Sequence, residues 1–219
     1  MSGSQPVVGI IDEDGRAYFL QDDGLMFWGK VTSSGSQISA TLSVAPARGT
    51  STTLWDGSSR GTASVGGTVQ ARTSMSAEHT ITSASGGQTT GTMTLNNVIS
   101  HGVDSSLDLV AGNYVVAFGE IGGVLNITNQ GDMFLQDPVS GCVANGEIAI
   151  MNSNFNVYDV RMLLSNCTGS HSVLNGVTFG GLAEAIFENT FTYADGVLAL
   201  LSGYVDGTSM PSRFVFYRQ

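Results

Sequence analysis

Cys142 and Cys167 are the residues whose type and surroundings define a chemistry most clearly. They are the only cysteines and no C-x-x-C spacing occurs, so a four-cysteine zinc site is excluded. Each lies among turn-forming residues, in Ser140-Gly141-Cys142 and Asn166-Cys167-Thr168-Gly169. These surroundings favour a disulfide over two free thiols. Because a disulfide persists only in an oxidising compartment, we expect an exported protein.

Two acidic turns, Asp12-Glu13-Asp14-Gly15 and Asp22-Asp23-Gly24, form the densest negative patch. Calcium needs six to eight oxygen ligands around one turn. The two turns flank an expected strand at 16–21, which separates them by about 20 Å. Hairpin turns are therefore favoured, and we expect no metal and no cofactor. The alternative is a calcium site built from Asp12, Asp14, Asp22 and Asp23.

Candidate catalytic residues are few. Gly57-Ser58-Ser59-Arg60-Gly61 fits the G-x-S-x-G pattern of hydrolases, which needs a strand before the serine and a helix after it. Here a turn precedes the serine and a strand pattern follows, so a surface loop is favoured. The three histidines, His79, His101 and His171, are far apart, and we expect them in solvated loops. No catalytic residue is assigned, and we expect a protein that is not an enzyme.

Trp55 is the candidate binding residue. It stands beside the Asp56-Gly57 turn, and exposed aromatic side chains often mark interfaces. The other tryptophan, Trp28, follows Leu25-Met26-Phe27, and we expect it in a buried strand.

The composition limits the classes of partner. The chain has 219 residues and a net charge of −10, with 42% hydrophobic and 12% charged residues. Such a chain folds rather than remaining disordered. Its basic residues, one lysine (Lys30) and scattered arginines, form no cluster, so nucleic acid and anionic membrane surfaces are disfavoured partners. No apolar run approaches the roughly 18 residues of a transmembrane helix.

Short segments of alternating polarity predict many β-strands. Period-two patterns run over 38–44, 69–75, 92–96 and 158–164, and 214–216 ends the chain in the same way. Asp-Gly pairs at 14, 23, 56, 195 and 206 and Asn-Gly pairs at 145 and 175 predict turns between them. A helix-like window at 182–191 also alternates as a strand, and flanking glycines favour the strand. The sequence therefore predicts antiparallel sheets closed into barrels or sandwiches.

An internal repeat predicts two similar domains. Phe19-Leu20-Gln21-Asp22 recurs as Phe134-Leu135-Gln136-Asp137, 115 positions later (134 minus 19). Gly66-Gly67 likewise matches Gly180-Gly181 at an offset of 114 (180 minus 66). We expect an all-β protein of two tandem antiparallel domains, 1–108 and 109–219, each a small barrel or sandwich, related by internal duplication.

Ser106-Leu107-Asp108-Leu109-Val110-Ala111-Gly112-Asn113-Tyr114 resembles the inter-domain "SLA–LAG-Y" signature of a family of uncharacterised bacterial envelope lipoproteins. The order of Gly141-Cys142, Asn156-Val157-Tyr158, Cys167 and Gly180-Gly181 is similar to that of the family's second domain, and Asp14-Gly15-Arg16-Ala17-Tyr18 is similar to its opening. The resemblance implies a Cys142–Cys167 disulfide and a lipid anchor upstream of Met1. It implies no activity, because none is established for the family.

The leading functional prediction is a non-enzymatic module of the bacterial envelope, in the periplasm or at the outer membrane or cell surface, that binds another envelope or extracellular protein. A β-barrel that binds a small ligand or a glycan is the alternative. A hydrolase whose site is assembled from distant loops is the third possibility. A filled barrel interior would count against the ligand alternative.

Overall fold

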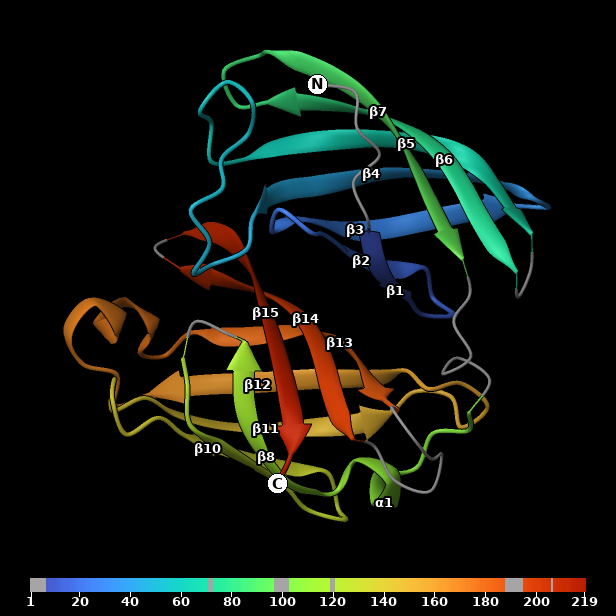
Figure 1. Cartoon of the computed structure of the whole chain (residues 1–219). Coiled ribbons are helices and arrows are strands. Elements are labelled where there is room, and N and C mark those ends of the chain that lie inside the picture. The colour runs from blue at the N-terminus through green and yellow to red at the C-terminus, as the bar shows by residue number, and fades with distance from the viewer. Residues whose placement is uncertain (1–6, 71–72, 97–102, 119–120, 188–194, 206) are drawn as a thin grey trace. The chain divides into compact units, whose positions relative to one another are not determined.

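The computed structural model describes residues 7–70, 73–96, 103–118, 121–187, 195–205 and 207–219 (Figure 1). The protein is all-β, which confirms the expected fold class. It divides into two compact units, Met1–Val98 and Ile99–Gln219, so the division falls earlier in the chain than the expected join at 108–109. Leu109 and Val110, at that join, pack into the core of the second unit.

The first unit is an open, curved sheet of seven antiparallel strands, which we call the half-barrel. Each strand pairs with the next one in the sequence, so hairpins make every connection. The strands are β1 (Val7–Ile11), β2 (Arg16–Gln21), β3 (Leu25–Ser34), β4 (Gln37–Pro46), β5 (Gly61–Gln70), β6 (Ser74–Ser83) and β7 (Gln88–Asn96).

The second unit is a closed antiparallel barrel of eight strands in the order β10-β11-β12-β13-β14-β15-β8-β9. Its elements are α1 (Leu107–Val110), β8 (Gly112–Phe118), β9 (Val124–Ile127), β10 (Asp132–Gln136), β11 (Val143–Ile150), β12 (Tyr158–Ser165), the 3-10 helix η2 (Gly169–Leu174), β13 (Thr178–Ile186), β14 (Gly196–Val205) and β15 (Thr208–Arg218). β8 closes the barrel because it pairs with both β15 and β9.

Each unit has its own hydrophobic core, because alternate side chains of every strand point to the same face. Phe19, Phe27 and Leu42 lie in the half-barrel core. Large side chains fill the barrel interior, and the fully buried ones include Tyr114, Tyr158, Phe179, Phe214 and Phe216.

Most of the predicted strands are confirmed. The patterns at 38–44 and 158–164 lie in β4 and β12, and the window at 182–191 begins in β13, although residues 188–191 lie outside the described residues. The expectation of one strand over 69–75 was wrong. β5 ends at Gln70 and β6 begins at Ser74, and Val69 pairs with Met75 across the hairpin. The end of β5 and the start of β6 together form one alternating pattern in the sequence, so the turn between them cannot be recognised from polarity alone.

The expected turn at Asn145-Gly146 was also wrong, because both residues lie within β11. A Cβ atom on Gly146 would lie 2.0 Å from the backbone oxygen of Arg161 on β12. The glycine there permits close approach of two strands instead of a tight turn. Asp14-Gly15 and Asp23-Gly24 do form the β1–β2 and β2–β3 turns, each with its glycine at positive φ.

The β1–β2 and β9–β10 hairpins share one pattern of hydrogen bonds. Gly15 N donates to Asp12 O and Gly15 O accepts from Val31 N, while Gly131 N donates to Thr128 O and Gly131 O accepts from Ile148 N. The two turns are 116 positions apart (131 minus 15), whereas the identical segments 19–22 and 134–137 are 115 positions apart. Phe19 is consequently buried, whereas Phe134 is exposed. That duplication produced the two units stays a prediction.

Candidate functional site

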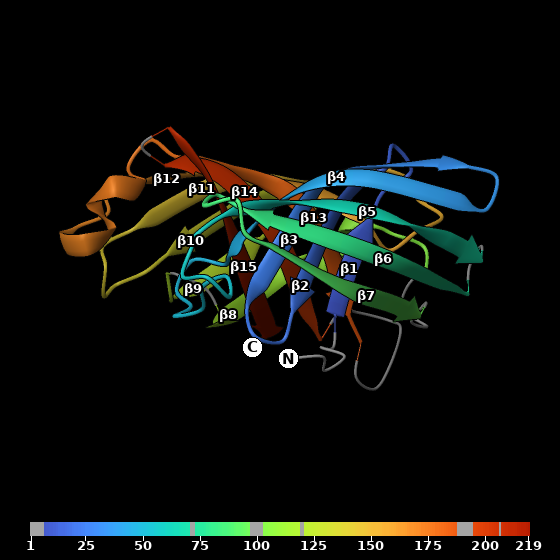
Figure 2. The same cartoon turned by 90° about the horizontal axis from the view of Figure 1, so that it is seen from above.

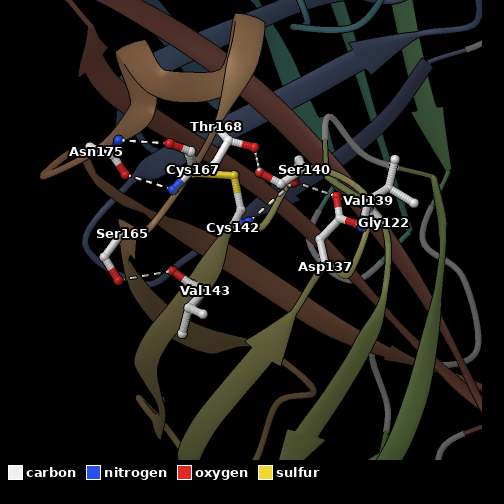
Figure 3. The surroundings of a disulfide bond; sticks show 10 residues. All are labelled: Gly122, Asp137, Val139, Ser140, Cys142, Val143, Ser165, Cys167, Thr168 and Asn175. Atoms are coloured by element: carbon white, nitrogen blue, oxygen red, sulfur yellow. Dashed lines mark hydrogen bonds between the residues drawn. A yellow bond between two sulfur atoms is a disulfide. The ribbon is translucent and has the colours of Figure 1, made fainter.

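The predicted disulfide is confirmed: Cys142 and Cys167 are bonded, with their Cα atoms 4.0 Å apart (Figure 3). Cys142 precedes β11 and Cys167 follows β12, next to the register pair Val143 and Ser165. The bond therefore fastens the end of the β11–β12 pair. Both polar atoms of the Asn175 side chain reinforce this point, because Cys167 N donates to Asn175 Oδ1 at 2.8 Å and Asn175 Nδ2 donates to Cys167 O at 3.0 Å.

A buried carboxylate, Asp137, organises the loop beside the disulfide (Figure 3). It accepts hydrogen bonds from Val139 N at 2.8 Å, Ser140 Oγ at 2.6 Å and Gly122 N at 3.1 Å. Burial raises the pKa of Asp137, but these hydrogen bonds outweigh burial and hold the pKa below its usual range. Asp137 thus remains ionised and fixes the course of the loop.

An open depression of about 510 Å³ lies at this end of the barrel. Its lining includes Asp137, Ser140, Thr168, Ser170 and His171. Thr168 donates to Ser140 O through both N and Oγ1, each at 2.8 Å, and Ser140 Oγ donates to Asp137. The polar atoms of this group therefore hold the two loops together.

The 106–114 segment, which carries the family resemblance, has a packing role in the barrel. Ser106 caps α1 by accepting from Leu109 N, and Leu109 and Val110 enter the core. The hydroxyl of Tyr114 donates to Val110 O at 2.7 Å and accepts from Arg218 Nη2 at 3.1 Å. Burial raises the pKa of Tyr114, and the positive charge of Arg218 partly offsets this effect. The segment is thus fastened to β15.

A second packing contact holds the same segment from the opposite wall. The hydroxyl of Tyr158 on β12 donates to Ser106 O at 3.2 Å. Burial raises the pKa of Tyr158 to about 12, so the phenol remains a hydrogen-bond donor at physiological pH. The two buried tyrosines therefore anchor the chain that leads into β8.

A band of uncharged side chains, most of them exposed, runs around the outer surface of the barrel. The strand register places its residues in two adjacent rows across β15, β8, β9, β10, β11 and β12. One row is Tyr217, Val115, Val124 and Gln136, and the other is Asn113, Asn126, Phe134, Asn145 and Leu163. We call these nine residues the neutral face.

Five apolar side chains dominate the neutral face. Their exposed fractions are 42% for Tyr217, 44% for Val115, 45% for both Val124 and Phe134, and 47% for Leu163. Amides lie between them, and Asn126 Nδ2 donates to Asn113 Oδ1 at 2.8 Å. Exposed apolar side chains gathered with hydrogen-bonding amides can exclude water and bind a matching surface.

Charged residues begin in the next row of the wall. Asp132, Glu147 and Arg161 are exposed register partners on β10, β11 and β12. The neutral face therefore has a charged boundary along these three strands, which is the usual arrangement of an apolar centre with a polar rim.

Trp55 lies in the loop between β4 and β5, with 48% of its surface exposed. The adjacent Asp56 accepts from Ser58 N at 3.0 Å and Ser85 Oγ at 2.5 Å. Hydrogen bonds from Ser83 and Ser85 hold the pKa of Asp56 well below its usual range. The loop is thus fastened to the β6–β7 turn, and the binding role of Trp55 stays a prediction. Trp28 is half-buried in β3 rather than fully buried.

The acidic turns lie at opposite ends of β2, as expected. Asp12 is largely buried and pairs with Arg16, accepting from its backbone N at 2.7 Å and its Nε at 2.5 Å. Within the described ranges, no group of three or more His, Cys, Asp or Glu side chains could hold a metal ion. Asp14, Asp22 and Asp23 thus join no such group.

The three histidines lie in different parts of the chain. His171 is in η2 at the edge of the depression, and His101 lies outside the described residues. The expected loop position of His79 was wrong: it lies in β6, and its side chain points into the half-barrel core. The residues of the G-x-S-x-G pattern lie in the β4–β5 loop, except Gly61, which begins β5.

Sequence reasoning missed the neutral face. Its signal is present in β10, where Met133, Phe134 and Leu135 are apolar on both sides of the strand. However, the partners of Phe134 come from strands whose register no single segment encodes.

No protein-family model and no curated protein matches this chain. Among solved structures, a "putative outer membrane protein" from Bacteroides fragilis is similar, with 10% sequence identity and a TM-score of 0.28. The match covers 97% of this chain and 87% of that chain. In the portion that the structure describes, no helix has the length and apolar character to cross a membrane. The function must therefore be argued from the surfaces of the chain.

Proposed function

We propose that this protein is a non-enzymatic module that binds another protein outside the cytosol. The neutral face of the barrel carries this proposal. At its centre, Val124 and Phe134 are exposed on the adjacent strands β9 and β10, beside Asn126 and Asn145, in a chain whose net charge is −10. An uncharged surface on so acidic a chain suits an apolar partner, because burying it leaves no unpaired charge.

The composition of the neutral face favours a protein partner. Tyrosine and phenylalanine supply much of the binding energy of protein interfaces, and backbone groups of a partner can bond to asparagine amides. The β-strands that carry these residues are rigid, so binding would order little of the chain.

The disulfide supports a location outside the cytosol, because a reducing compartment would not preserve it. The resemblance to envelope lipoproteins extends the proposal to the bacterial envelope and to a lipid anchor upstream of Met1. The acidic character of the chain agrees with a protein partner rather than nucleic acid.

A small-ligand site is the second candidate, and the depression beside the disulfide favours it. The barrel interior, where β-barrels commonly hold ligands, is instead filled by aromatic side chains. The hydrogen bonds of Asp137, Ser140 and Thr168 already join the loops. Binding through the neutral face is therefore the better supported function.

Photo-crosslinking in cells that export the chain tests the proposal. A photoreactive amino acid replaces Phe134, Val124 or Asn145, one at a time, on the adjacent strands β10, β9 and β11. The expected result is one and the same protein adduct from all three positions. Because these residues lie at the interface centre, Phe134→Asp should weaken binding of the identified partner at least about tenfold.

Val173 provides the matched control, since it is 46% exposed and lies in η2, outside the neutral face. The photoreactive group at this position should give no adduct with that partner. Equal adducts from position 173 and from the three face positions would contradict the proposal, as would unchanged binding by the Phe134→Asp variant.

A further inference from the structure

Trp55 lies where a loop and a turn of the half-barrel meet. The loop joins β4 to β5, the turn joins β6 to β7, and these four strands lie side by side (Figure 2). Gly61 at the start of β5 pairs with Ser83 at the end of β6, so the loop and the turn leave the same end of the sheet. We call residues 54–60 and 83–87 the Trp55 site.

Three polar atoms of the Trp55 site converge beside Gly87. A Cβ atom on Gly87 would lie 3.1 Å from Asp56 Oδ2 and 3.3 Å from Ser83 Oγ. The same Cβ atom would lie 3.6 Å from Trp55 Nε1. Gly87 does not have positive φ, so the backbone does not require glycine here. The missing side chain instead leaves a carboxylate acceptor, a hydroxyl and an indole donor uncovered beside one another.

Hydrogen bonds hold this group of atoms in place. Asp56 accepts from Ser58 N at 3.0 Å and from Ser85 Oγ at 2.5 Å, and Ser85 Oγ lies 2.9 Å from Ser83 Oγ. These bonds keep the pKa of Asp56 well below its usual range, so the carboxylate remains an acceptor. Leu54, which precedes Trp55, is buried in the half-barrel core. A site that is already ordered loses little conformational freedom when it binds a ligand.

The composition of the Trp55 site favours a small neutral ligand. Its charged residues are Asp56 and Arg60, whose charges cancel. Among the described residues of the half-barrel, the other exposed large apolar side chains are Val8 and Ile11. Both lie in β1, which pairs with β2 and not with β4 or β6. The indole of Trp55 is therefore an isolated apolar surface among polar groups, whereas a protein interface gathers several apolar side chains at its centre.

We propose that the Trp55 site binds a neutral saccharide. A sugar ring has an apolar face of C–H groups and an edge of hydroxyl groups. The C–H face would lie on the indole of Trp55, which is 48% exposed. The hydroxyl groups would donate to Asp56 and bond to the exposed Ser85. This site belongs to the half-barrel and the neutral face to the barrel, so the proposal does not depend on the proposed function.

Titration of the full chain with cellotriose, maltotriose, laminaritriose and mannotriose, each to about 10 mM, tests the proposal. Ligand-observed NMR gives the Kd, and we expect at least one of these sugars to bind. Trp55→Ala should weaken its binding at least about tenfold. Trp28→Phe, in β3, should leave the Kd unchanged.

A pair of glycine variants provides a matched control. Gly87→Ala should also weaken binding, because its methyl group would cover the polar atoms beside Trp55. Gly66→Ala, in β5, should leave the Kd unchanged, since a Cβ atom there has no neighbour within 4 Å. Equal weakening by the two variants would overturn the proposal. So would an unchanged Kd for Trp55→Ala, or binding of none of the four sugars.

The polymers starch, laminarin and mannan distinguish two sources of the saccharide. Equal affinity per site for a trisaccharide and its polymer would indicate a free sugar, and tighter binding of the polymer would indicate a polysaccharide. Both results would support the proposal. A photoreactive amino acid in place of Ser59 tests for a protein at the same site. A protein adduct from this position without binding of any sugar would overturn the proposal in favour of a protein partner.

Discussion

His79 is a histidine in an apolar core. Its ring lies 5.9 Å from the ring of Phe27 in an edge-to-face arrangement, and its register partners are Val65 on β5 and Gly91 on β7. None of these neighbours can titrate, and Nδ1 has no hydrogen-bond partner among the described residues. Gly91 makes room for the ring, because a Cβ atom there would lie 2.8 Å from it. Burial therefore lowers the pKa of His79.

Acidification should destabilise the half-barrel through His79. Because the pKa is lower in the folded state than the ordinary 6.5, the unfolded state binds more protons below that pH. The contribution of neutral His79 to the free energy of unfolding is fully present above about pH 6.5. It is lost as the pH decreases, by at most about 1.4 kcal/mol per pH unit for one group. Urea unfolding followed by tryptophan fluorescence measures this effect, since Trp28 and Trp55 both belong to the half-barrel.

His79→Leu should remove this pH dependence between pH 7 and 5, whereas His171→Gln should keep it. The prediction fails if both variants show the pH dependence of the unmodified chain. The position of His79 was not predictable from its neighbours in the sequence, because Glu78 and Thr80 on either side are polar, as in a solvated strand or loop. The pairing of β6 with β5 and β7 determines that the side of β6 carrying His79 faces the core.

Two adjacent glycines in β13 differ in the space around them: Gly181 is crowded by β14, whereas Gly180 is not. The position of Gly181 against Leu200 O leaves no room for a side chain, whereas a Cβ atom on Gly180 would have its nearest neighbour at 3.8 Å. Gly181→Ala should therefore force β13 and β14 apart and cost about 1–3 kcal/mol. Gly180→Ala should change stability by less than about 0.5 kcal/mol.

Chemical denaturation of the two variants, followed by circular dichroism, measures both free energies of unfolding. The half-barrel offers a second matched pair, since Gly67 is crowded by Ser76 O and Gly66 has no atom within 4 Å. Equal destabilisation by alanine at both positions of a pair would show that close strand approach is not the cause.

Elements with a clear period of two were predictable, and those that depend on pairing were not. Inner and outer residues alternate from Gln37 to Val44 in β4 and over the whole of β12, so their inner faces follow from the sequence. In contrast, the β5–β6 turn lies within one continuous pattern, and Gly146 resembles a turn residue but permits strand contact. The outer residues of β10 gain significance only beside β9 and β11.

The Cys142–Cys167 disulfide stabilises the barrel, whereas both tryptophans lie in the half-barrel, so the stability of the barrel needs a probe other than tryptophan fluorescence. The disulfide joins residues 25 positions apart in the barrel. Cys142→Ser combined with Cys167→Ser should lower the free energy of unfolding of the barrel by about 3–4 kcal/mol in the chain-entropy model. Hydrogen exchange of β11 and β12 measures this loss, and reduction of the unmodified chain should reproduce it. Unchanged exchange in both experiments would contradict the prediction.

The closure of only one sheet was not predictable from the chain. Both units are rich in hairpins with alternating strands, and the sequence therefore predicts two similar domains, each a small barrel or sandwich. Whether a sheet closes depends on its two edge strands meeting in register. β8 provides that closure in the barrel through two ladders, and the pattern of Gly112–Phe118 alone does not distinguish it from an ordinary strand.

The identical segments 19–22 and 134–137 have an offset of 115, whereas the equivalent turns at Gly15 and Gly131 have an offset of 116. This difference of one residue affects how homologues of this chain can be detected by alignment. An alignment of the two halves that maximises identity superimposes the buried Phe19 on the exposed Phe134. A profile built on that alignment would average interior with surface preferences along β2 and β10 and lose sensitivity for distant homologues. Aligning the glycine turns first, and accepting the mismatched letters, would preserve the inside-to-outside order of the strands.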